Sequence, residues 1–170
     1  MPPSIRIIDD AFLDALAEEA AAAPRRRKNA NLHQENTAVC HRLFNALQAD
    51  TYIRPHRHDH AAKDETVVIL RGKMGLVEFD EHGAVLSARL LHPGMSVDIP
   101  HGTFHGWCCM EDGTIFFEAK AGPYTAMTEA EWAAFAPPEG DPRAPDYLAE
   151  LKTWCTRSTL SPPIPEENKP

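Results

Sequence analysis

The sequence has no excess of basic residues and no long apolar run, and each absence argues against a class of protein. Its 17 Lys and Arg residues are outnumbered by 25 Asp and Glu residues, giving a net charge of −8. Nucleic acids and anionic membranes need a basic face, so we expect neither as a partner. No uncharged apolar run reaches the roughly 18 residues of a membrane-spanning helix. The N-terminus lacks a basic start followed by an apolar core, so we expect a cytoplasmic protein.

The sequence also lacks a cysteine pattern, an internal repeat and a glycine-rich phosphate loop. Cys40, Cys108, Cys109 and Cys155 have neither the spacing of a zinc ribbon nor that of a CxxC redox motif. The adjacent Cys108 and Cys109 would lie on opposite faces of any strand that they share. We therefore expect free, buried thiols, which are normal in the cytosol.

Histidines carry the main signal. His56 and His58 are two residues apart, so both rings point to the same side of an extended chain. Glu65 opens an apolar run that ends at Gly72 and is typical of a buried strand closed by a turn. His105 follows a segment with glycine and proline turns. Three imidazoles and a carboxylate are a metal-binding set.

Two motifs that contain these residues resemble those of the cupins. The first is His-x-His with a later Glu, six residues and Gly, and the second is Gly-x5-Pro-x-Gly-x2-His, which here begins at Gly94. The resemblance implies a mainly β fold, a cupin-type antiparallel jelly-roll barrel. Short strands separated by glycine and proline turns favour the same architecture. The implied metal ligands are His56, His58, Glu65 and His105.

The identity of the fourth ligand is left open by the spacing of the first motif. Six residues separate His58 from Glu65, where three or four are usual, and the longer turn could present His60 or Asp64 instead. We favour Glu65 because its distance to Gly72 is intact. Three nitrogens and one oxygen suit one divalent transition metal, and Fe, Mn, Ni and Zn are all compatible.

The surroundings of both motifs are similar to the WbuC family of cupin-fold metalloproteins, over roughly residues 25–125. The similarity rests on the basic run at 25–28, on Asn29, Asn31 and His33, on residues 40–58 and on Gly122, Pro123 and Tyr124. It implies a link with surface-polysaccharide gene neighbourhoods. A sugar or nucleotide sugar is therefore the first ligand class to consider, although a fold alone assigns no chemistry.

We expect four parts. Residues 1–27 form a strand and helix extension, 28–125 the barrel with its metal site, 126–157 short helices, and 158–170 a proline-rich extended or disordered tail.

The N-terminal part is expected to hold a short strand at residues 4–8 and a helix capped by Asp9 and Asp10. This helix would pack on the barrel or on a second subunit, which leaves a homodimer open.

The C-terminal part is expected to hold two structural helices. Thr128 and Glu131 form a capping box that opens a short helix running through Trp132 and Phe135. A second helix is expected from residue 145 or 146 to Cys155, with one apolar stripe.

Three further residues are candidates for contacting a substrate. His33 lies in a polar loop, residues 29–37, that could fold over the barrel mouth, and Arg42 lies on a strand with two partly covered faces. Trp107 shares a strand face with His105. Each has a plainer interpretation, respectively a solvated loop residue, a salt-bridged arginine and a core indole. The basic run at 25–28 is interpreted as a solvated linker rather than an anion-binding patch.

Two classes of function fit these residues. The first is a metal-dependent small-molecule enzyme of oxygenase, isomerase or lyase type, whose metal polarises a substrate oxygen or activates water or O₂. The second is a non-catalytic metal-dependent binding or sensor module. No second catalytic base with clear spacing is visible, but a metal-bound hydroxide can itself be the base. The sequence leaves the choice open.

Overall fold

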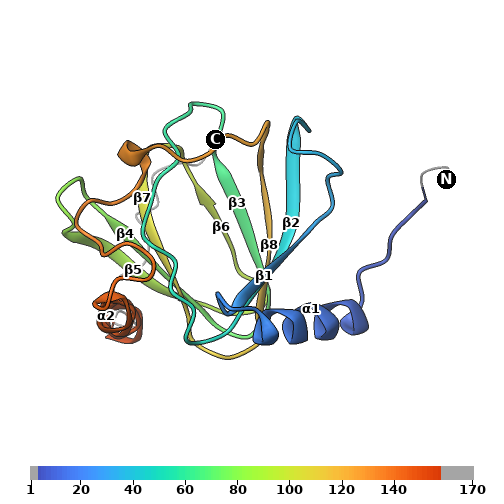
Figure 1. Ribbon diagram of the computed structural model, residues 1–170, viewed down its shortest axis with the longest axis horizontal. Helices are drawn as coiled ribbons and strands as arrows, with labels where there is room; N and C mark the ends of the chain where they lie inside the picture. The colour runs from blue at the N-terminus through green and yellow to red at the C-terminus, as the bar shows by residue number, and fades with distance from the viewer. Residues whose placement is uncertain (1–3, 158–170) are drawn as a thin grey trace, which may run out of the picture.

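Two antiparallel sheets face each other in the computed structural model, which describes residues 4–157 (Figure 1). The larger sheet has the order β1-β2-β8-β3-β6 and the smaller one β5-β4-β7. The strands are β1 (Arg27–Asn31), β2 (Cys40–Leu47), β3 (Glu65–Arg71), β4 (Met74–Phe79), β5 (Val85–Leu91), β6 (Ser96–Ile99), β7 (Phe104–Cys109) and β8 (Thr114–Ala121). The prediction of a mainly β, antiparallel barrel with flanking helices is confirmed.

The N-terminal helix α1 (Asp10–Ala22) begins where its cap predicts. The Asp9 carboxylate accepts a hydrogen bond from the Phe12 backbone N–H at 3.0 Å. The strand expected at residues 4–8 is wrong: this segment pairs with no strand of the described residues. Ile5 and Ile7 are exposed, so the apolar residues that suggested a strand have no sheet edge to join.

The C-terminal part differs from the expectation in one of its two helices. α2 (Ala144–Arg157) confirms the second helix, and Leu148, Leu151 and Cys155 of the expected stripe are buried. The first helix is wrong, because only a three-residue 3-10 turn, η1 (Glu129–Glu131), forms. After this turn the Ala133 N–H bonds to the Pro55 carbonyl, so the chain pairs with another segment instead of continuing a helix. The tail expected at 158–170 lies outside the described residues.

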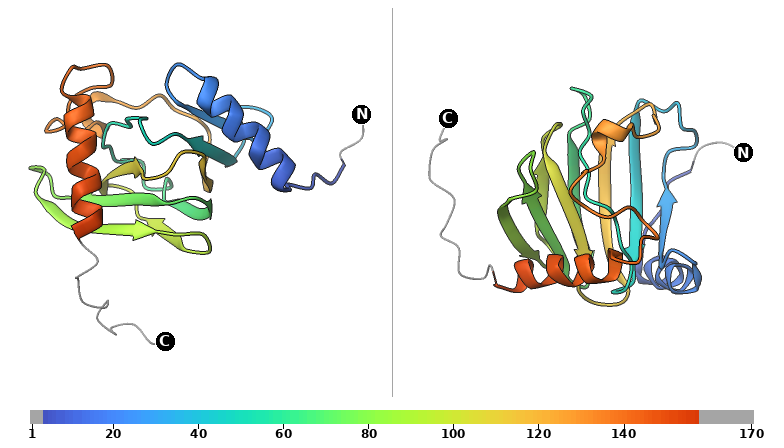
Figure 2. Two further views of the ribbon diagram at one scale, coloured as in Figure 1. Left: turned by 90° about the horizontal axis from the view of Figure 1, so that it is seen from below. Right: turned by 60° about the vertical axis from the view of Figure 1, so that its left-hand side comes forward.

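Three apolar clusters hold the layers together. One fills the barrel and includes Trp107, Cys109 and Phe116. A second lies between the smaller sheet and α2, and a third between α1 and the outer face of the larger sheet. Both helices lie at the same end of the barrel, at the bottom of Figure 1, and Figure 2 shows the same arrangement from two other sides.

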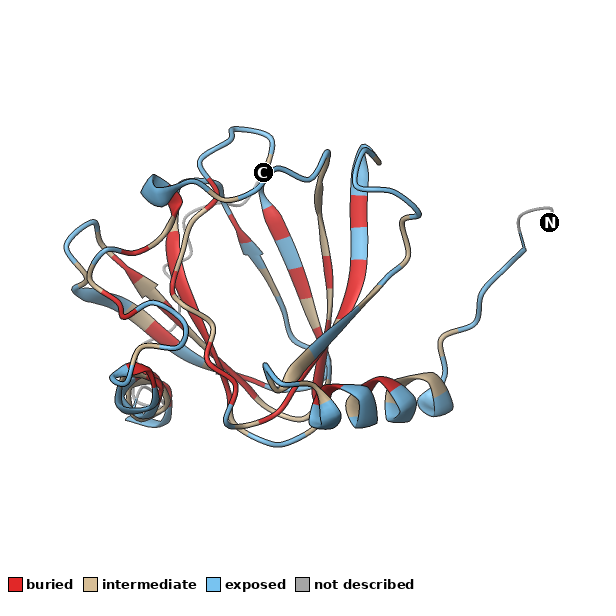
Figure 3. Cartoon of the chain, viewed as in Figure 1, coloured by how far each residue is buried: buried red, intermediate tan, exposed pale blue. Residues whose placement is uncertain are grey.

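Strand β7 is buried throughout because it has a layer on each side (Figure 3). Its odd-numbered residues His105, Trp107 and Cys109 face the barrel, whereas Cys108 faces α2. The predicted alternation is therefore confirmed, as are buried free thiols at Cys108, Cys109 and Cys155. Cys40 departs from the expectation because it is exposed at the start of β2.

Two features of the larger sheet differ from the sequence interpretation. The residues expected to start a polar loop at position 29 belong to β1, which pairs with β2 from Arg27 onwards. Strand β3 is covered on only one side, since Thr66 and Leu70 are exposed. The apolar run of β3 is therefore buried on one face only, because no helix covers its outer face among residues 4–157.

Candidate metal centre

His56 and His105 are placed side by side by their backbones. Each N–H donates to the carbonyl of the other at 2.9 Å, so the two residues form one hydrogen-bonded antiparallel pair. Their side chains share a face, and the ring centroids lie 4.6 Å apart. His58 follows two residues later, with its ring centroid 5.3 Å from that of His56. The segment around His56 and His58 is extended rather than a named strand, yet it brings the three rings together as the spacing predicts.

The orientation of two rings is set by backbone carbonyls. His56 Nδ1 lies 3.0 Å from the Arg54 carbonyl oxygen, and His105 Nδ1 lies 3.0 Å from that of Thr103. If each Nδ1 carries the proton, each Nε2 is left with a lone pair, the state that binds metals. His105 Nε2 is buried and has no hydrogen-bond partner among residues 4–157. A buried nitrogen without a partner is costly, which indicates a site meant for a ligand.

Glu65 joins the histidines from the start of β3. Its side chain is buried, and one carboxylate oxygen lies 3.1 Å from His58 Nε2. Burial opposes ionisation of this carboxyl, but the His58 hydrogen bond and the Lys120 charge outweigh it and lower the pKa of Glu65. The carboxylate is therefore held as an anion next to the three imidazoles.

The other residues considered as fourth ligand lie elsewhere. His60 is exposed, and its Nδ1 accepts from the Ala62 backbone N–H. Asp64 is exposed and pairs with His101, whose Nδ1 lies 2.8 Å from the carboxylate. The long turn thus points both side chains away from the cluster and leaves Glu65 as the carboxylate that faces it.

The glycines of the two motifs form turns at opposite ends of β3, Gly102 near the cluster and Gly72 beside Thr114. Gly102, with φ of +79°, donates its N–H to the His58 carbonyl at 2.8 Å and so ties the two motifs together. Gly72 has φ of +75°, and a Cβ there would lie 2.4 Å from Thr114 Oγ1. Both positions therefore require glycine.

Sequence reasoning missed two residues that hold the cluster in place. Glu131, expected only to cap a helix, accepts a hydrogen bond from the Asp59 N–H at 3.2 Å, and its backbone carbonyl accepts one from Arg57 at 2.9 Å. It thus holds the residues on both sides of His58. Trp132 forms a backbone bridge with His56, and the two rings are 5.8 Å apart. The capping-box pattern located Glu131, but it could not indicate the distant partner.

A second buried carboxyl, Glu118 on β8, was also missed. Asn45 Nδ2 donates to its Oε2 at 2.9 Å, and Lys120 Nζ lies 2.6 Å from its Oε1. The contact with Lys120 is an ion pair. Its angle is not that of a hydrogen bond, and Glu118 Oε1 accepts no hydrogen bond within residues 4–157. Burial and the nearby Glu65 charge raise the pKa of Glu118. Glu118 shares a strand face with Phe116, and the alternation of side chains along β8 was the available signal.

A cavity of about 280 Å³ connects these groups. His56, Glu65 and Trp107 line it together with Glu118 and Lys120. Trp107 stacks on Phe116 with centroids 5.8 Å apart, so it belongs to the core and also borders the cavity. Basic side chains from the start of β1 complete the wall, namely Arg25, Arg27 and Lys28. The basic run is therefore not a linker, because Arg27 and Lys28 belong to β1, although Arg25 and Lys28 are exposed as expected.

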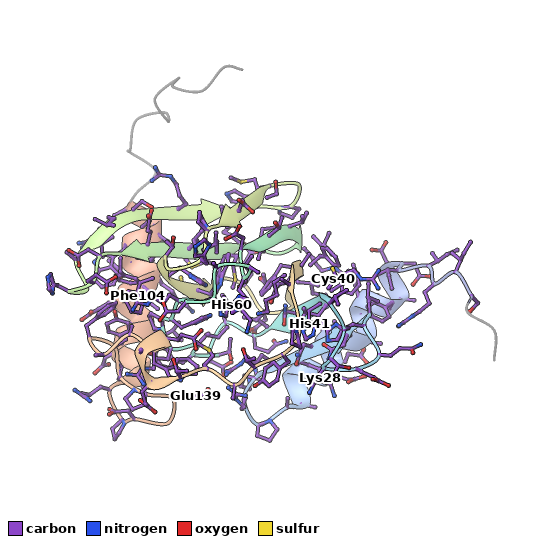
Figure 4. All side chains as sticks on the ribbon, turned by 90° about the horizontal axis from the view of Figure 1, so that it is seen from above. Lys28, Cys40, His41, His60, Phe104 and Glu139 are labelled. Atoms are coloured by element: carbon purple, nitrogen blue, oxygen red, sulfur yellow. The ribbon has the colours of Figure 1, made fainter. Side chains whose placement is uncertain are left out.

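His33 and Arg42 are not brought to this cavity. They line a separate hollow on the outside of the protein, where His33 Nδ1 lies within 3.2 Å of backbone atoms of Arg42. His33 stacks on His41 at a centroid distance of 4.1 Å. Arg42 faces outwards because β2 alternates, and Asn45 takes the inward position that Arg42 was expected to fill. Figure 4 labels His41 on this strand and shows the side chains from above.

The donors fit a metal in kind but are not yet arranged around one. Among residues 4–157, no group of three or more His, Cys, Asp or Glu side chains has the spacing of a formed metal site. The His58–Glu65 hydrogen bond accounts for part of this, because it occupies one potential metal-binding atom of each residue. The unpartnered Nε2 of His105 and the neighbouring His56 ring supply the remaining donors.

The fold is cupin-like. SPY1581 from Streptococcus pyogenes, described as a conserved protein of unknown function, has a TM-score of 0.50 and 13% identity, covering 72% of this chain and 92% of its own. KdgF from Halomonas sp. has a TM-score of 0.48 and 18% identity, covering 61% and 84%. At 13% identity, the similarity to SPY1581 shows the fold alone.

Oxalate decarboxylase from Bacillus subtilis, described with Mn(II) centres, has a TM-score of 0.45 and 15% identity over 59% of this chain. The chain spans 26% of that protein's length. The model of a family described as a domain of unknown function (DUF6016) matches residues 8–91. No curated protein matches. The similarity to the WbuC family stays a prediction.

No helix of the described residues is both long and apolar enough to span a membrane.

Proposed function

We propose that this protein binds one divalent transition metal through His56, His58, His105 and Glu65, and that the metal holds a small molecule in the adjoining cavity. The buried, unpartnered Nε2 of His105 carries the proposal, because it lies in a cluster whose other members are metal-binding types. Binding would replace the His58–Glu65 hydrogen bond with bonds from both side chains to the cation. Fe, Mn, Ni and Zn all suit such a set of donors.

The bound metal would supply a Lewis acid that polarises a ligand oxygen. The chain's own residues would do the rest. The Arg54 and Thr103 carbonyls hold the His56 and His105 rings, and Glu131 fixes the residues on either side of His58. Trp107 closes the apolar side of the cavity.

We favour an enzyme over a binding module because the cavity holds a second carboxyl. Asn45 and Lys120 position Glu118 on the same wall as Glu65, which supplies the proton-transfer group that the sequence did not reveal. The binding or sensor module remains the second candidate function, supported by the many ion pairs that already engage the charged groups of the wall.

The resemblance to WbuC makes sugars and nucleotide sugars of surface-polysaccharide metabolism the first compounds to test. Metal-loaded protein, purified without a histidine tag, would be screened with free sugars and nucleotide sugars for product and for a rise in melting temperature. Product formation supports the enzyme, and a raised melting temperature without product supports the module. If neither occurs with any member of the panel, the sugar hypothesis is wrong.

A further inference from the structure

Three sulfur atoms come together in the layer between the smaller sheet and α2. Cys108 of β7 and Cys155 of α2 are both buried, and their Sγ atoms lie 3.8 Å apart. Met110, just after β7, places its Sδ 3.9 Å from Cys108 Sγ. Figure 2 shows α2 lying across the smaller sheet, where it contacts all three strands. Since side chains alternate along a strand, this layer is on the opposite face of β7 from His105.

The backbone of β4 leaves room for both thiols at one point. Gly75 lies opposite Cys108 in the β4–β7 register. A Cβ at position 75 would lie 2.4 Å from Cys108 Sγ and 2.7 Å from Cys155 Sγ, both too short for a non-bonded contact. A side chain at this position would therefore displace one or both sulfurs. The two thiols converge on the same place because residue 75 is glycine.

Both thiols have only weak partners in this layer. Cys108 Sγ contacts the two other sulfurs, and Cys155 Sγ lies 3.7 Å from the Leu76 carbonyl oxygen. Thiols are weak hydrogen-bond donors, so contacts of this length cost little to give up. The adjacent Cys109 differs, because its Sγ lies 2.9 Å from the Glu111 carbonyl oxygen. A bond from a metal to Cys108 and Cys155 would thus replace weak contacts only.

The spacing and the chemistry of the sulfurs select the kind of ion. Metal–sulfur bonds of about 2.3 Å place the sulfurs of a trigonal site about 4 Å apart. The two separations here are 3.8 and 3.9 Å, so such a site needs little movement of the side chains. Thiolates and thioethers are soft ligands that favour Cu(I), whereas structural zinc sites use four ligands from cysteine and histidine. The surrounding cluster, which includes Val77, Phe79 and Leu151, is apolar and does not suit a hard cation.

We propose that Cys108, Cys155 and Met110 bind one Cu(I) ion between the smaller sheet and α2. The two cysteines bind as thiolates and release their protons to solvent, and Met110 binds as a neutral thioether. The complex then carries one negative charge. Lys152 lies three residues before Cys155, hence on the same face of α2, and its ammonium offsets this charge. Met110 is only partly buried, which gives the ion a way in. The inference does not depend on metal binding at the histidine cluster.

Anaerobic titration with Cu(I) against a competing chelator tests this site. The parent protein is Cys40→Ser, because the exposed Cys40 thiol would bind the ion by itself. We expect the parent to hold one Cu(I) per chain with sulfur ligands only, as seen by X-ray absorption at the copper edge. This spectrum separates the site from the histidine cluster, whose ligand atoms are nitrogen and oxygen.

Three variants of the parent separate a sulfur site from an effect of packing. Cys155→Ala should lower the Cu(I) affinity by about 100-fold or more, since even groups that only orient a ligand contribute about 10- to 100-fold. Met110→Leu should lower it by about tenfold. Leucine keeps the volume of methionine and hence the fold, so a loss there reports the thioether. Cys109→Ala is the matched control, because it removes an equally buried thiol that faces the barrel, and it should leave the affinity unchanged.

Four results would overturn the inference. The first is that the parent binds no Cu(I), or binds it through nitrogen and oxygen atoms. The second is an equal loss of affinity in Cys109→Ala and Cys155→Ala, and the third is full affinity in Met110→Leu. The fourth is a disulfide between Cys108 and Cys155 in a protein that retains no copper, which would make the pair a redox element. The histidine cluster is tested separately, by its content of divalent metal, so the two proposals can fail independently.

Discussion

Replacing Glu131 by Ala should destabilise the protein and loosen the metal centre together. The carboxylate accepts hydrogen bonds from the Thr128 N–H at 2.8 Å, from the Thr128 hydroxyl at 3.1 Å and from the Asp59 N–H at 3.2 Å. The substitution leaves two backbone donors without this partner: one can turn to water, the other costs about 1–3 kcal/mol, and the lost hydrogen bond from the Thr128 hydroxyl adds about 1 kcal/mol. We therefore expect a loss of about 2–4 kcal/mol in the free energy of unfolding.

Urea denaturation followed by tryptophan fluorescence measures this loss. With an m value of about 2 kcal/mol/M, the midpoint should fall by about 1–2 M. Glu129→Ala is the matched control, because Glu129 is exposed in the same turn, and it should change the free energy by no more than about 0.5 kcal/mol. Metal affinity should fall about 10- to 100-fold in Glu131→Ala alone, since groups that orient ligands have effects of this size. Equal midpoints for Glu131→Ala and the wild type would refute the reasoning.

Three further predictions concern the ligand set, pH and the core. Glu65→Gln should lower metal affinity by about tenfold or more in a chelator competition, because a neutral amide replaces an anionic donor; unchanged metal content with lost turnover would instead make Glu65 a base. Burial and the neighbouring His105 lower the pKa of His56 to about 3, whereas unfolded histidine titrates near 6.5, so the metal-free protein should lose up to about 1.4 kcal/mol per pH unit as the pH falls below 6.5. A urea midpoint that does not change from pH 7 to pH 5 would contradict this. Leu151→Ala should cost about 2–5 kcal/mol in the same urea assay, since Leu151 is fully buried, and the exposed Leu86→Ala should cost almost nothing.

The sequence predicted the parts of the fold that depend on local pattern. Alternation on β7 placed His105 and Trp107 on one face and put Cys108 and Cys109 on opposite faces. The strand expected at residues 4–8 does not form. Its β-favouring residues Ile5 and Ile7 are exposed and have no neighbouring strand to pair with. The helix after Thr128 failed because a long-range hydrogen bond from Ala133 to Pro55 replaced the helical one.

The candidate site was predictable only where its residues belong to spaced motifs. The motifs brought His56, His58, Glu65 and His105 together, and the structure places them within one cluster. Arg42 and Asn45 are both polar residues of the same strand, and only the register with β8 shows which of them faces inwards. Lys120 had no motif at all. Its role depends on lying opposite Glu65 across two strands more than 50 residues apart in sequence, which no local pattern reveals.

The metal content of purified variants tests the central claim most directly. Elemental analysis of the wild type should find one transition metal per chain, and His56→Ala, His58→Ala and His105→Ala should lose it. His82→Ala and His92→Ala should keep it, because both residues are exposed and lie in turns outside the cluster. If the wild type takes up no metal, or if His82→Ala empties the protein while His58→Ala leaves it loaded, the proposed centre is wrong.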